Sequence, residues 1–326
     1  MSSEKADGRT VLLTGGTGFL GSHVAEALCR AGLRVRCTVR ATSDTSRLSG
    51  LPVEVVETDL RSADSLGEAL QGARLVVHAA GVTRARREAD YFAVNAEGTE
   101  RIAARAAAGG VERFVFVSSL AARGPDGARG PVSPYGASKR EAERRLADAV
   151  AGSELTTRVL RPGGIYGPRE KDLLPLFRLA RLGILVAPPG AGRLQPVHVS
   201  DVAAAILRAI DAPGEDPGPL AVAGPAIVGW RDVASALAAA VGGRVRLLRL
   251  PGGVFRAAGA VAEAAAVATG RTPTFDRRQA NDLTRLAWTC DLEPAERHLG
   301  WTPHVGLRDG IVETAEWYRE AGWLKG

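Results

Sequence analysis

Two side chains near the middle of the chain, the phenol of Tyr135 and the ammonium group of Lys139, stand four residues apart. A phenol has an ordinary pKa of about 10, so it needs a positive neighbour to act as acid and base near neutral pH. At positions i and i+4 of a helix the two side chains share one face, where the ammonium group would favour the phenolate. The pair therefore predicts proton transfer, although the same spacing alone is also common on ordinary helix surfaces.

A hydroxyl donor that meets a substrate carbonyl is expected in the same place. Ser118 and Ser119 end an apolar run that precedes the helix of Tyr135. A side chain from this serine pair could point into the cleft that Tyr135 and Lys139 line.

A glycine-rich turn lies far upstream, between Gly15 and Gly21. Its pattern, Gly16-x-Gly18-x-x-Gly21, follows an apolar strand and precedes a helix, which is the context of a dinucleotide-binding turn. One glycine permits the tight turn, the next lets the pyrophosphate approach the backbone, and the third lets helix and strand pack closely. The helix N-terminus offers N–H donors and a partial positive charge to the phosphates. Together with the Tyr135 and Lys139 pair, this turn predicts redox chemistry at a carbon that bears oxygen.

The end of the second strand bears on which dinucleotide is bound. An acidic residue there would accept a hydrogen bond from the ribose 2′-hydroxyl and repel a 2′-phosphate. This chain has Thr38, Val39 and Arg40 instead, with Arg47 seven residues further on. Arginine suits forked recognition of phosphate, so NADP(H) is favoured. NAD(H) stays possible if Arg40 faces water or stacks on adenine.

Apolar strand patterns alternate with helical ones over the first half of the chain, which predicts βαβ units and a parallel sheet with helices on both faces. We expect an α/β fold with a doubly wound parallel sheet and a smaller C-terminal substrate lobe. Residues 1–165 would form the dinucleotide-binding domain, with 195–212 returning to it, and 166–326 would mostly form the lobe. The expected strands cover 10–13, 33–40, 53–58, 75–78, 114–118 and 156–160, and the expected helices 23–31, 62–70, 95–108 and 135–150.

The composition is that of an ordinary globular protein of 326 residues. The formal net charge is +6, but the 42 basic residues are scattered among 36 acidic ones without a long basic run, so no nucleic-acid partner is expected. Three cysteines without metal-ligand spacing predict no metal site and fit a reducing compartment. The polar start lacks a signal-peptide pattern, and no window has the apolar length of a membrane span. We therefore expect a cytoplasmic protein.

These motifs together resemble the extended short-chain dehydrogenase/reductase family, in its epimerase/dehydratase branch, with dihydroflavonol-reductase-like and 3β-hydroxysteroid-dehydrogenase-like members nearest in pattern. The resemblance covers nearly the whole chain and implies a Rossmann-type sheet. The segments that carry it, beyond the glycine turn and the Tyr135 motif, are Asp59-Leu60, His78 to Gly81, Asn95 to Thr99, Phe116 to Ser119, Arg161 to Pro168, Val197 to Val202 and Leu299 to Pro303.

The resemblance implies a set of cofactor contacts. Asp59 and Leu60 would hold the adenine, the segment after His78 would lie beside the ribose, and the segment after Arg161 would lie on the nicotinamide side. The implied cofactor-binding residues are Gly15, Thr17, Gly18, Phe19, Leu20, Gly21, Arg40, Arg47, Asp59, Leu60, Ala79, Ala80, Gly81, Lys139, Pro162, Gly163 and Ile165.

The resemblance also implies catalytic roles. Ser119, favoured over Ser118 by alignment to Gly124, would orient and polarise the substrate oxygen. Tyr135 would donate or accept its proton, Lys139 would tune Tyr135 and bind the ribose, and the nicotinamide would carry the hydride. Asn95 would be a structural or active-site asparagine. His78 and His198 are interpreted as structural.

Three functions stay open at this point. The first is an NAD(P)-dependent oxidoreductase that acts on a carbonyl or secondary alcohol, favoured by Arg40, Arg47 and Gly164. The second is a nucleotide-sugar epimerase or dehydratase with tightly bound NAD, in which Arg169, Lys171 and Arg193 could bind a diphosphate. The third is a non-catalytic cofactor-sensing or assembly protein, which the intact Tyr135 and Lys139 disfavour.

The substrate and the oligomeric state follow less directly. The C-terminal segments are rich in Ala, Val, Leu and Gly, which suits an apolar small-molecule substrate and equally suits a core. Leu176, Phe177 and Leu179 are expected at the mouth of the site. The helices that start at Asn95 and Tyr135 resemble the pair that forms a four-helix bundle in family dimers, so a homodimer is a further hypothesis.

Overall fold

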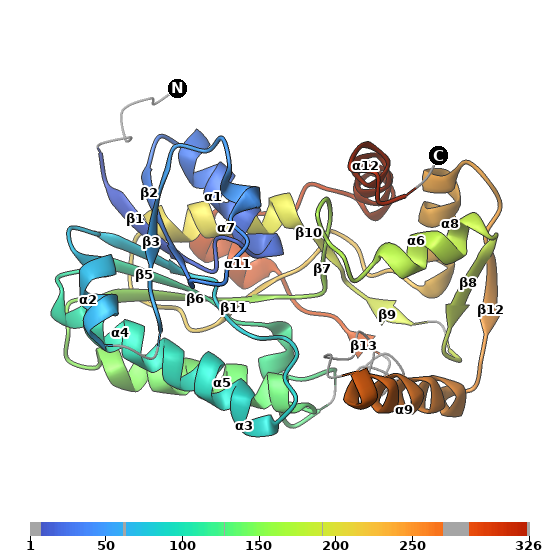
Figure 1. The fold of residues 1–326 in the computed structure, drawn as a ribbon, viewed down its shortest axis with the longest axis horizontal. Coiled ribbons are helices and arrows are strands. Elements are labelled where there is room, and N and C mark those ends of the chain that lie inside the picture. The colour runs from blue at the N-terminus through green and yellow to red at the C-terminus, as the bar shows by residue number, and fades with distance from the viewer. Residues whose placement is uncertain (1–7, 61–62, 127, 191, 270–286, 325–326) are drawn as a thin grey trace.

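A seven-stranded parallel sheet is the centre of the molecule (Figure 1). The computed structural model describes residues 8–60, 63–126, 128–190, 192–269 and 287–324. The strand order is β11-β6-β5-β4-β1-β2-β3, and each neighbouring pair is parallel. The strands are β1 (Thr10–Thr14), β2 (Arg34–Val39), β3 (Val53–Glu57), β4 (Leu75–His78), β5 (Arg113–Val117), β6 (Thr156–Pro162) and β11 (Leu220–Val222).

Helices cover both faces of this sheet, because its strands alternate apolar side chains between two cores. Val11 and Leu13 face one core, whereas Leu12 between them faces the other. The first face is covered by α1 (Phe19–Arg30), α7 (Val199–Asp211) and α11 (Glu293–Leu299). The second is covered by α2 (Ala63–Leu70), α4 (Gly98–Ala108) and α5 (Pro134–Val150). The predicted Rossmann-type, doubly wound sheet is thus confirmed.

A smaller lobe with its own core lies beside the sheet (Figure 1). Its main elements are α6 (Leu174–Arg181), β8 (Ile184–Ala187), α8 (Trp230–Val241), β12 (Arg246–Arg249), α9 (Gly252–Thr269) and α12 (Leu307–Glu320). Short strand pairs line its junction with the sheet, namely β7 (Ile165–Tyr166) with β10 (Val197–His198) and β9 (Arg193–Leu194) with β13 (Ala287–Trp288). The remaining short elements are η1 (Ser46–Leu48), α3 (Glu88–Tyr91), the π-helical turn η2 (Phe92–Glu97) and η3 (Leu120–Ala122).

Two segments beyond residue 212 also join the unit formed by the sheet and its helices. β11 extends the sheet by pairing with β6, and Leu220 and Val222 are buried in the core of its first face. Leu299 and Trp301 belong to the same core, where the Trp301 indole N–H donates to the carbonyl of Asp201 at 3.0 Å. The unit is therefore assembled from more returning segments than 195–212 alone.

Phe177 does not line a mouth, contrary to the prediction. Its side chain is fully buried in the lobe core, and its ring lies 5.0 Å from that of Tyr318 in an edge-on contact. Leu176 packs against the same core, whereas Leu179 is exposed. The apolar character of α6 thus serves the core on one side. Among the described residues, no helix is long and apolar enough to cross a membrane.

Candidate active site

The glycine-rich turn connects β1 to α1 at the carboxyl edge of the sheet. Gly15 has a φ of 77°, which disfavours a side chain, and a Cβ there would lie 2.7 Å from the backbone nitrogen of Ala80. A Cβ at Gly21 would overlap the carbonyl group of Gly15. Gly18 is the N-cap of α1, so the helix begins at Phe19, earlier than predicted. The turn is a cradle that side chains would fill, which fits the pyrophosphate of a dinucleotide.

The segment after β4 forms a second wall beside this turn. The backbone N–H of Ala80 donates to Thr14 Oγ1 at 3.2 Å, which holds Ala79, Ala80 and Gly81 against the end of β1. In the turn itself, Gly18 is exposed, and the side chains of Thr17, Phe19 and Leu20 are half-buried. The structure therefore brings these two predicted cofactor segments together.

The residues predicted to select the dinucleotide, and those predicted to hold its adenine, follow the next two strands. Arg40 directly follows β2 and is exposed, while Arg47 is half-buried and donates to the carbonyl of Arg169 at 3.2 Å. Asp59 and Leu60 follow β3, where the Ser65 hydroxyl donates to the carbonyl of Asp59 at 3.1 Å. All four lie at the same edge as the glycine turn, because parallel strands end at one edge.

Ser119 follows the end of β5, and Tyr135 and Lys139 lie near the start of α5. A Cβ at Gly136 would overlap the carbonyl group of Ala121, so the first turn of α5 lies directly on η3. This close approach places the Ser119 hydroxyl beside the Tyr135 phenol, where it can favour the phenolate. Burial raises the pKa of Tyr135, and the Ser119 hydroxyl opposes that rise.

Lys139 is buried one turn further along α5. Its ammonium group donates to the carbonyl of Val117 at 2.7 Å and lies 4.3 Å from the centre of the Phe116 ring. Burial lowers the pKa of Lys139 to about 7, and the negative charge of Glu143 opposes that change. Its charge is therefore sensitive to small changes around it.

Asn95 lies in the π-helical turn between α3 and α4 and braces the site. Its Oδ1 accepts from the backbone N–H of Val82 at 2.8 Å, and its Nδ2 donates to the carbonyl of Val82 and to Ser138 Oγ, each at 3.0 Å. Ser138 directly precedes Lys139. Asn95 thus ties the loop after β4 to α5, with both ends of its amide engaged by the protein.

Glu143 is a site residue that the sequence interpretation missed. Its carboxylate accepts a hydrogen bond from Ser118 and two from the Arg161 guanidinium, one of them at 2.8 Å from Nε. The Glu143 side chain is 9% exposed. Ser118 is therefore engaged away from Tyr135, which leaves Ser119 as the hydroxyl beside it. The signal that could have found Glu143 is its spacing, four residues after Lys139 on the same helix face.

His78 connects the ends of β1 and β4 to α4 below the site. Its Nδ1 lies 2.7 Å from Thr14 Oγ1 and its Nε2 lies 3.0 Å from Thr99 Oγ1. Burial lowers the pKa of His78 to about 3, so the ring is neutral, and it stacks on Phe116. This geometry fits the structural interpretation of His78.

The loop after β6 closes the other side of the site. Pro162 is buried, the N–H of Gly163 donates to the carbonyl of Val222 at 2.8 Å, and Ile165 lies in β7. Further along this loop, Arg169 donates to Ser22 Oγ at 3.1 Å and pairs with Glu26 of α1.

Two of the three cations that could bind a diphosphate already have partners inside the protein. Arg169 is engaged by α1, and the Lys171 ammonium group lies 5.3 Å from the centre of the Trp323 ring. Arg193 is exposed on β9. This arrangement gives little support to a diphosphate site built from the three.

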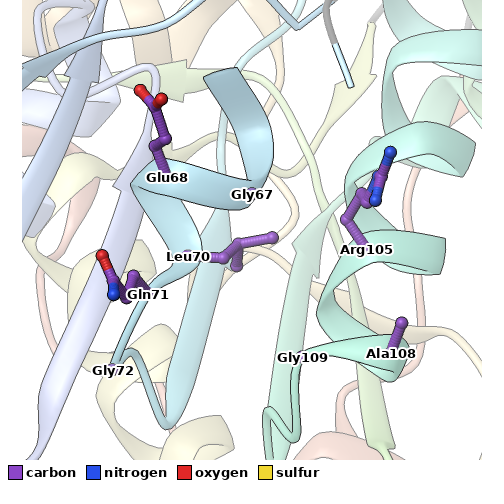
Figure 2. A pocket seen from close by; sticks show the side chains of 8 residues that line it. All are labelled: Gly67, Glu68, Leu70, Gln71, Gly72, Arg105, Ala108 and Gly109. Carbon is purple, nitrogen blue, oxygen red and sulfur yellow. The ribbon is translucent and has the colours of Figure 1, made fainter. Parts of the chain in front are cut away.

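A surface hollow elsewhere holds none of these residues (Figure 2). It lies between the last turns of α2 and α4, next to the amino ends of β4 and β5. Ligands of open α/β sheets bind at the carboxyl edge instead. Its lining residues are Gly67, Glu68, Leu70, Gln71, Gly72, Arg105, Ala108 and Gly109. Among the described residues, there is also no cluster of side chains that could hold a metal ion.

Comparison with known proteins agrees with this geometry. Residues 11–223 match the family model "NAD dependent epimerase/dehydratase family". The chain belongs to this family. It is 36% identical over 315 residues to a ceramide reductase of Caulobacter vibrioides, covering 96% of each chain. It is 29% identical over 318 residues to a 4-hydroxy-2-methyl-3-oxo-4-farnesyl-3,4-dihydroquinoline-1-oxide ketoreductase of Stigmatella aurantiaca, covering 92% of this chain and 93% of that one.

Among solved structures, MoeE5 in complex with UDP-glucuronic acid and NAD superposes with a TM-score of 0.75. It is 25% identical and covers 96% of this chain and 99% of that one. The predicted membership of the extended short-chain dehydrogenase/reductases is thus confirmed. The protein is an NAD(P)-dependent oxidoreductase of this family.

Proposed function

We propose that this oxidoreductase transfers hydride between a nicotinamide and a carbonyl or secondary alcohol carbon of an apolar substrate, with Tyr135 as the acid and base. The single observation that carries the proposal is that Ser119 lies beside the Tyr135 phenol where β5 ends and α5 begins, with the buried Lys139 ammonium group one turn further along α5, close to Gly81. This is the set of groups that reduction of a carbonyl needs.

Each of these residues has a separate role in the reduction of a carbonyl group. The nicotinamide supplies the hydride when bound. The Ser119 hydroxyl donates a hydrogen bond to the substrate oxygen as negative charge develops there. Tyr135 donates its proton to that oxygen, and the resulting phenolate is stabilised by Ser119 and by the nearby Lys139. Oxidation of an alcohol uses the same groups in the reverse direction.

Asn95 acts, in this proposal, as a positioning residue. Its amide holds the loop after β4 and the residue before Lys139, and both of its N–H donors are engaged by the protein. The contacts of the cofactor with the glycine turn, with Ala79 to Gly81 and with Pro162, Gly163 and Ile165 remain predictions that the geometry supports.

For the cofactor, we propose a preference for NADP(H) over NAD(H). No carboxylate stands at the end of β2, and Arg40 and Arg47 lie at the carboxyl edge there. Arginine can pair with a 2′-phosphate through two parallel N–H groups. The ratio of kcat/KM for NADPH to that for NADH measures the preference directly.

For the substrate, we propose an apolar carbonyl compound. Support comes from the relatives named as a ceramide reductase and as a ketoreductase of a farnesyl compound. The alternative is a nucleotide-sugar epimerase, which the solved relative with UDP-glucuronic acid favours. A nicotinamide cofactor that survives purification would favour the epimerase. Weakly held NADPH that is oxidised on addition of a ketone would favour the reductase.

For the assembly, we propose a cytoplasmic homodimer built on α4 and α5. These two helices pack against each other on one face of the sheet, and their outer side carries charged groups, including the ion pair of Arg145 with Glu100. Sedimentation of the purified protein measures the assembly mass.

Replacement of Tyr135 by phenylalanine tests the proposed chemistry. Y135F removes the proton donor and keeps the ring, so turnover should fall by roughly two to four orders of magnitude. The affinity for the nicotinamide cofactor should change little. Single-turnover rates and cofactor titration measure the two effects.

Tyr91 offers a matched control, because its ring lies 6.4 Å from that of Tyr135 and its hydroxyl contacts only the carbonyl of Thr83 in the described part of the chain. Y91F should retain most of the activity. Undiminished turnover in Y135F would refute the assignment of the proton donor.

A further inference from the structure

The excess of positive over negative charge in this chain lies in two segments of the lobe. Residues 173–200 and 233–262 contain seven arginines and no Asp, Glu or Lys, which leaves 35 basic and 36 acidic residues in the rest of the chain. The net charge of +6 therefore belongs to these segments, although neither holds a long basic run. All seven arginines are exposed, namely Arg178, Arg181, Arg193, Arg244, Arg246, Arg249 and Arg256.

Most of these arginines meet at one place in the fold. β8 and β12 pair in parallel, with Arg246 opposite Ile184, and the backbone N–H of Arg246 donates to the carbonyl of Gly183 at 2.8 Å. The end of α6 is thereby joined to the start of β12. We call residues 178–186 and 244–256 the lobe rim. It lies at the end of the molecule away from the seven-stranded sheet (Figure 1).

The lobe rim also exposes aliphatic side chains. Leu185 and Leu247 face the lobe core, so their neighbours Leu248 and Arg246 face outward, as strand alternation requires. Leu182 is 73% exposed, Leu248 43% and Val254 46%. Six of the seven large hydrophobic residues that are exposed in the described part of the chain lie in the lobe. Leu182, Leu248 and Val254 therefore share the lobe rim with its exposed arginines.

We propose that the lobe rim binds the surface of an anionic phospholipid bilayer. Exposed arginines in segments that contain no Asp or Glu are attracted to anionic headgroups, and the aliphatic side chains of the rim can enter the boundary with the acyl chains. No membrane-spanning helix is needed for such binding.

Other occupants fit the lobe rim less well. A second copy on a twofold axis would bring arginines against arginines, and like charges repel. Single-stranded nucleic acid is held by aromatic side chains on which bases stack, whereas the large exposed apolar residues of the rim are leucine and valine. An anionic bilayer matches both the charge and the aliphatic groups.

Binding at the lobe rim would deepen the proposed function. An apolar carbonyl compound partitions into a bilayer, so a docked enzyme would meet its substrate there. This link rests on the proposed function, whereas the binding itself does not, and the two can be tested separately.

Vesicle flotation with the full chain tests the binding. The protein should float with vesicles of phosphatidylcholine and phosphatidylglycerol, remain behind with phosphatidylcholine alone, and be released by high salt. R246E should weaken binding at least roughly tenfold, because it reverses one charge of the rim. L248S should also weaken it, since an aliphatic group is lost.

Matched controls come from the sheet domain. Arg105 on α4 is exposed, and Val55 on β3 is 46% exposed, close to the value for Leu248. R105E and V55S should bind vesicles like the unchanged protein. The melting temperature should be unchanged in R246E and R105E, and it should fall by similar small amounts in L248S and V55S, because each of these loses a half-exposed aliphatic group from a strand.

The outcomes separate the two proposals. Equal binding to both vesicle types would overturn the proposal that the lobe rim binds an anionic bilayer. Vesicle binding by R246E that equals binding by R105E would overturn it as well. A change of assembly mass in R246E with unchanged vesicle binding would show that the rim is an interface between two copies of the chain. That result would also overturn the proposed binding to a bilayer. Turnover of a water-soluble ketone should be the same in R246E and the unchanged protein, and its absence from both would sink the proposed function alone.

Discussion

At the scale of single residues, the charge of Lys139 is the quantity on which the site depends. The ammonium group is buried against Val117 and Phe116, and its pKa is lowered from 10.5 to about 7. A group at this pKa is half charged near neutral pH. Two predictions follow from its surroundings, one for folding and one for activity.

Folding stability should report the lowered pKa of Lys139. Between about pH 7 and 10.5 the unfolded chain holds a proton on Lys139 that the folded chain has released. The free energy of unfolding of the cofactor-free protein, relative to that of K139M, should therefore rise with pH in this window, by at most about 1.4 kcal/mol per pH unit. It should be flat below the window. Denaturant titrations of both proteins at several pH values measure this, and parallel curves throughout would contradict it.

Activity should report the link from Glu143 to Lys139. The Glu143 carboxylate raises the pKa of Lys139 against the effect of burial, and Arg161 holds that carboxylate in place. In E143Q the charge is lost, so the pKa of Lys139 should fall and the pH profile of kcat/KM should move to lower pH. The measurement is that profile with a saturating nicotinamide cofactor.

Glu141 supplies the control for this prediction. It lies on the same helix but pairs with Arg144 and Arg145 on the outer side. E141Q should leave the pH profile where it is. A Glu143 with a purely structural role would lower the melting temperature of E143Q and leave the profile unmoved.

At the scale of elements, replacement of glycine by alanine is expected to have opposite effects in the glycine turn and in the α2 helix. G21A would force a methyl group onto the Gly15 carbonyl, so the turn must open and nicotinamide binding should be lost. Gly67 lies inside α2 with open space around it. G67A should raise the free energy of unfolding by about 0.5 to 1 kcal/mol, because alanine favours a helix interior. Cofactor titration and thermal melting measure the two outcomes.

Local signals explain which elements could be predicted from the sequence. β1, the glycine turn and α5 each follow from a pattern of neighbouring residues, and the Tyr135 and Lys139 spacing places both at one end of a helix. β11 could not be found this way. It has only three residues, and its pairing with β6 links positions about sixty residues apart. Short strands are recognised by their partner in the sheet more than by their own sequence.

The same reasoning explains which features of the site could be predicted from local sequence and which could not. Ser119 and Ser118 are equivalent as residue types, and only the fold turns one to Tyr135 and the other to Glu143. Phe177 was expected at the mouth because α6 is apolar, but its face was decided by the ring of Tyr318 from a distant helix. The uneven charge of the lobe can be counted in the sequence, but only the pairing of β8 with β12 shows that the two arginine-bearing segments lie side by side.

At the scale of the whole molecule, cofactor binding and substrate binding are joined by contacts across the junction. His23 and Arg169 connect α1 to the loop after β6, and the Tyr318 hydroxyl of α12 donates to the carbonyl of Glu170 in the same loop. The loop therefore receives contacts from both the sheet domain and the lobe. A substrate bound against the lobe can affect the glycine-turn helix through it.

The sheet also has a consequence for how the chain is made. Its last strand ends at Val222, and the core of its first face is completed only by Leu299 and Trp301. Until β11 leaves the ribosome, β6 has an open edge. Until Leu299 and Trp301 follow, the nascent protein keeps an apolar face exposed to water. A gene shortened after residue 165 should therefore yield an insoluble product, even though every residue that would touch the dinucleotide is already present.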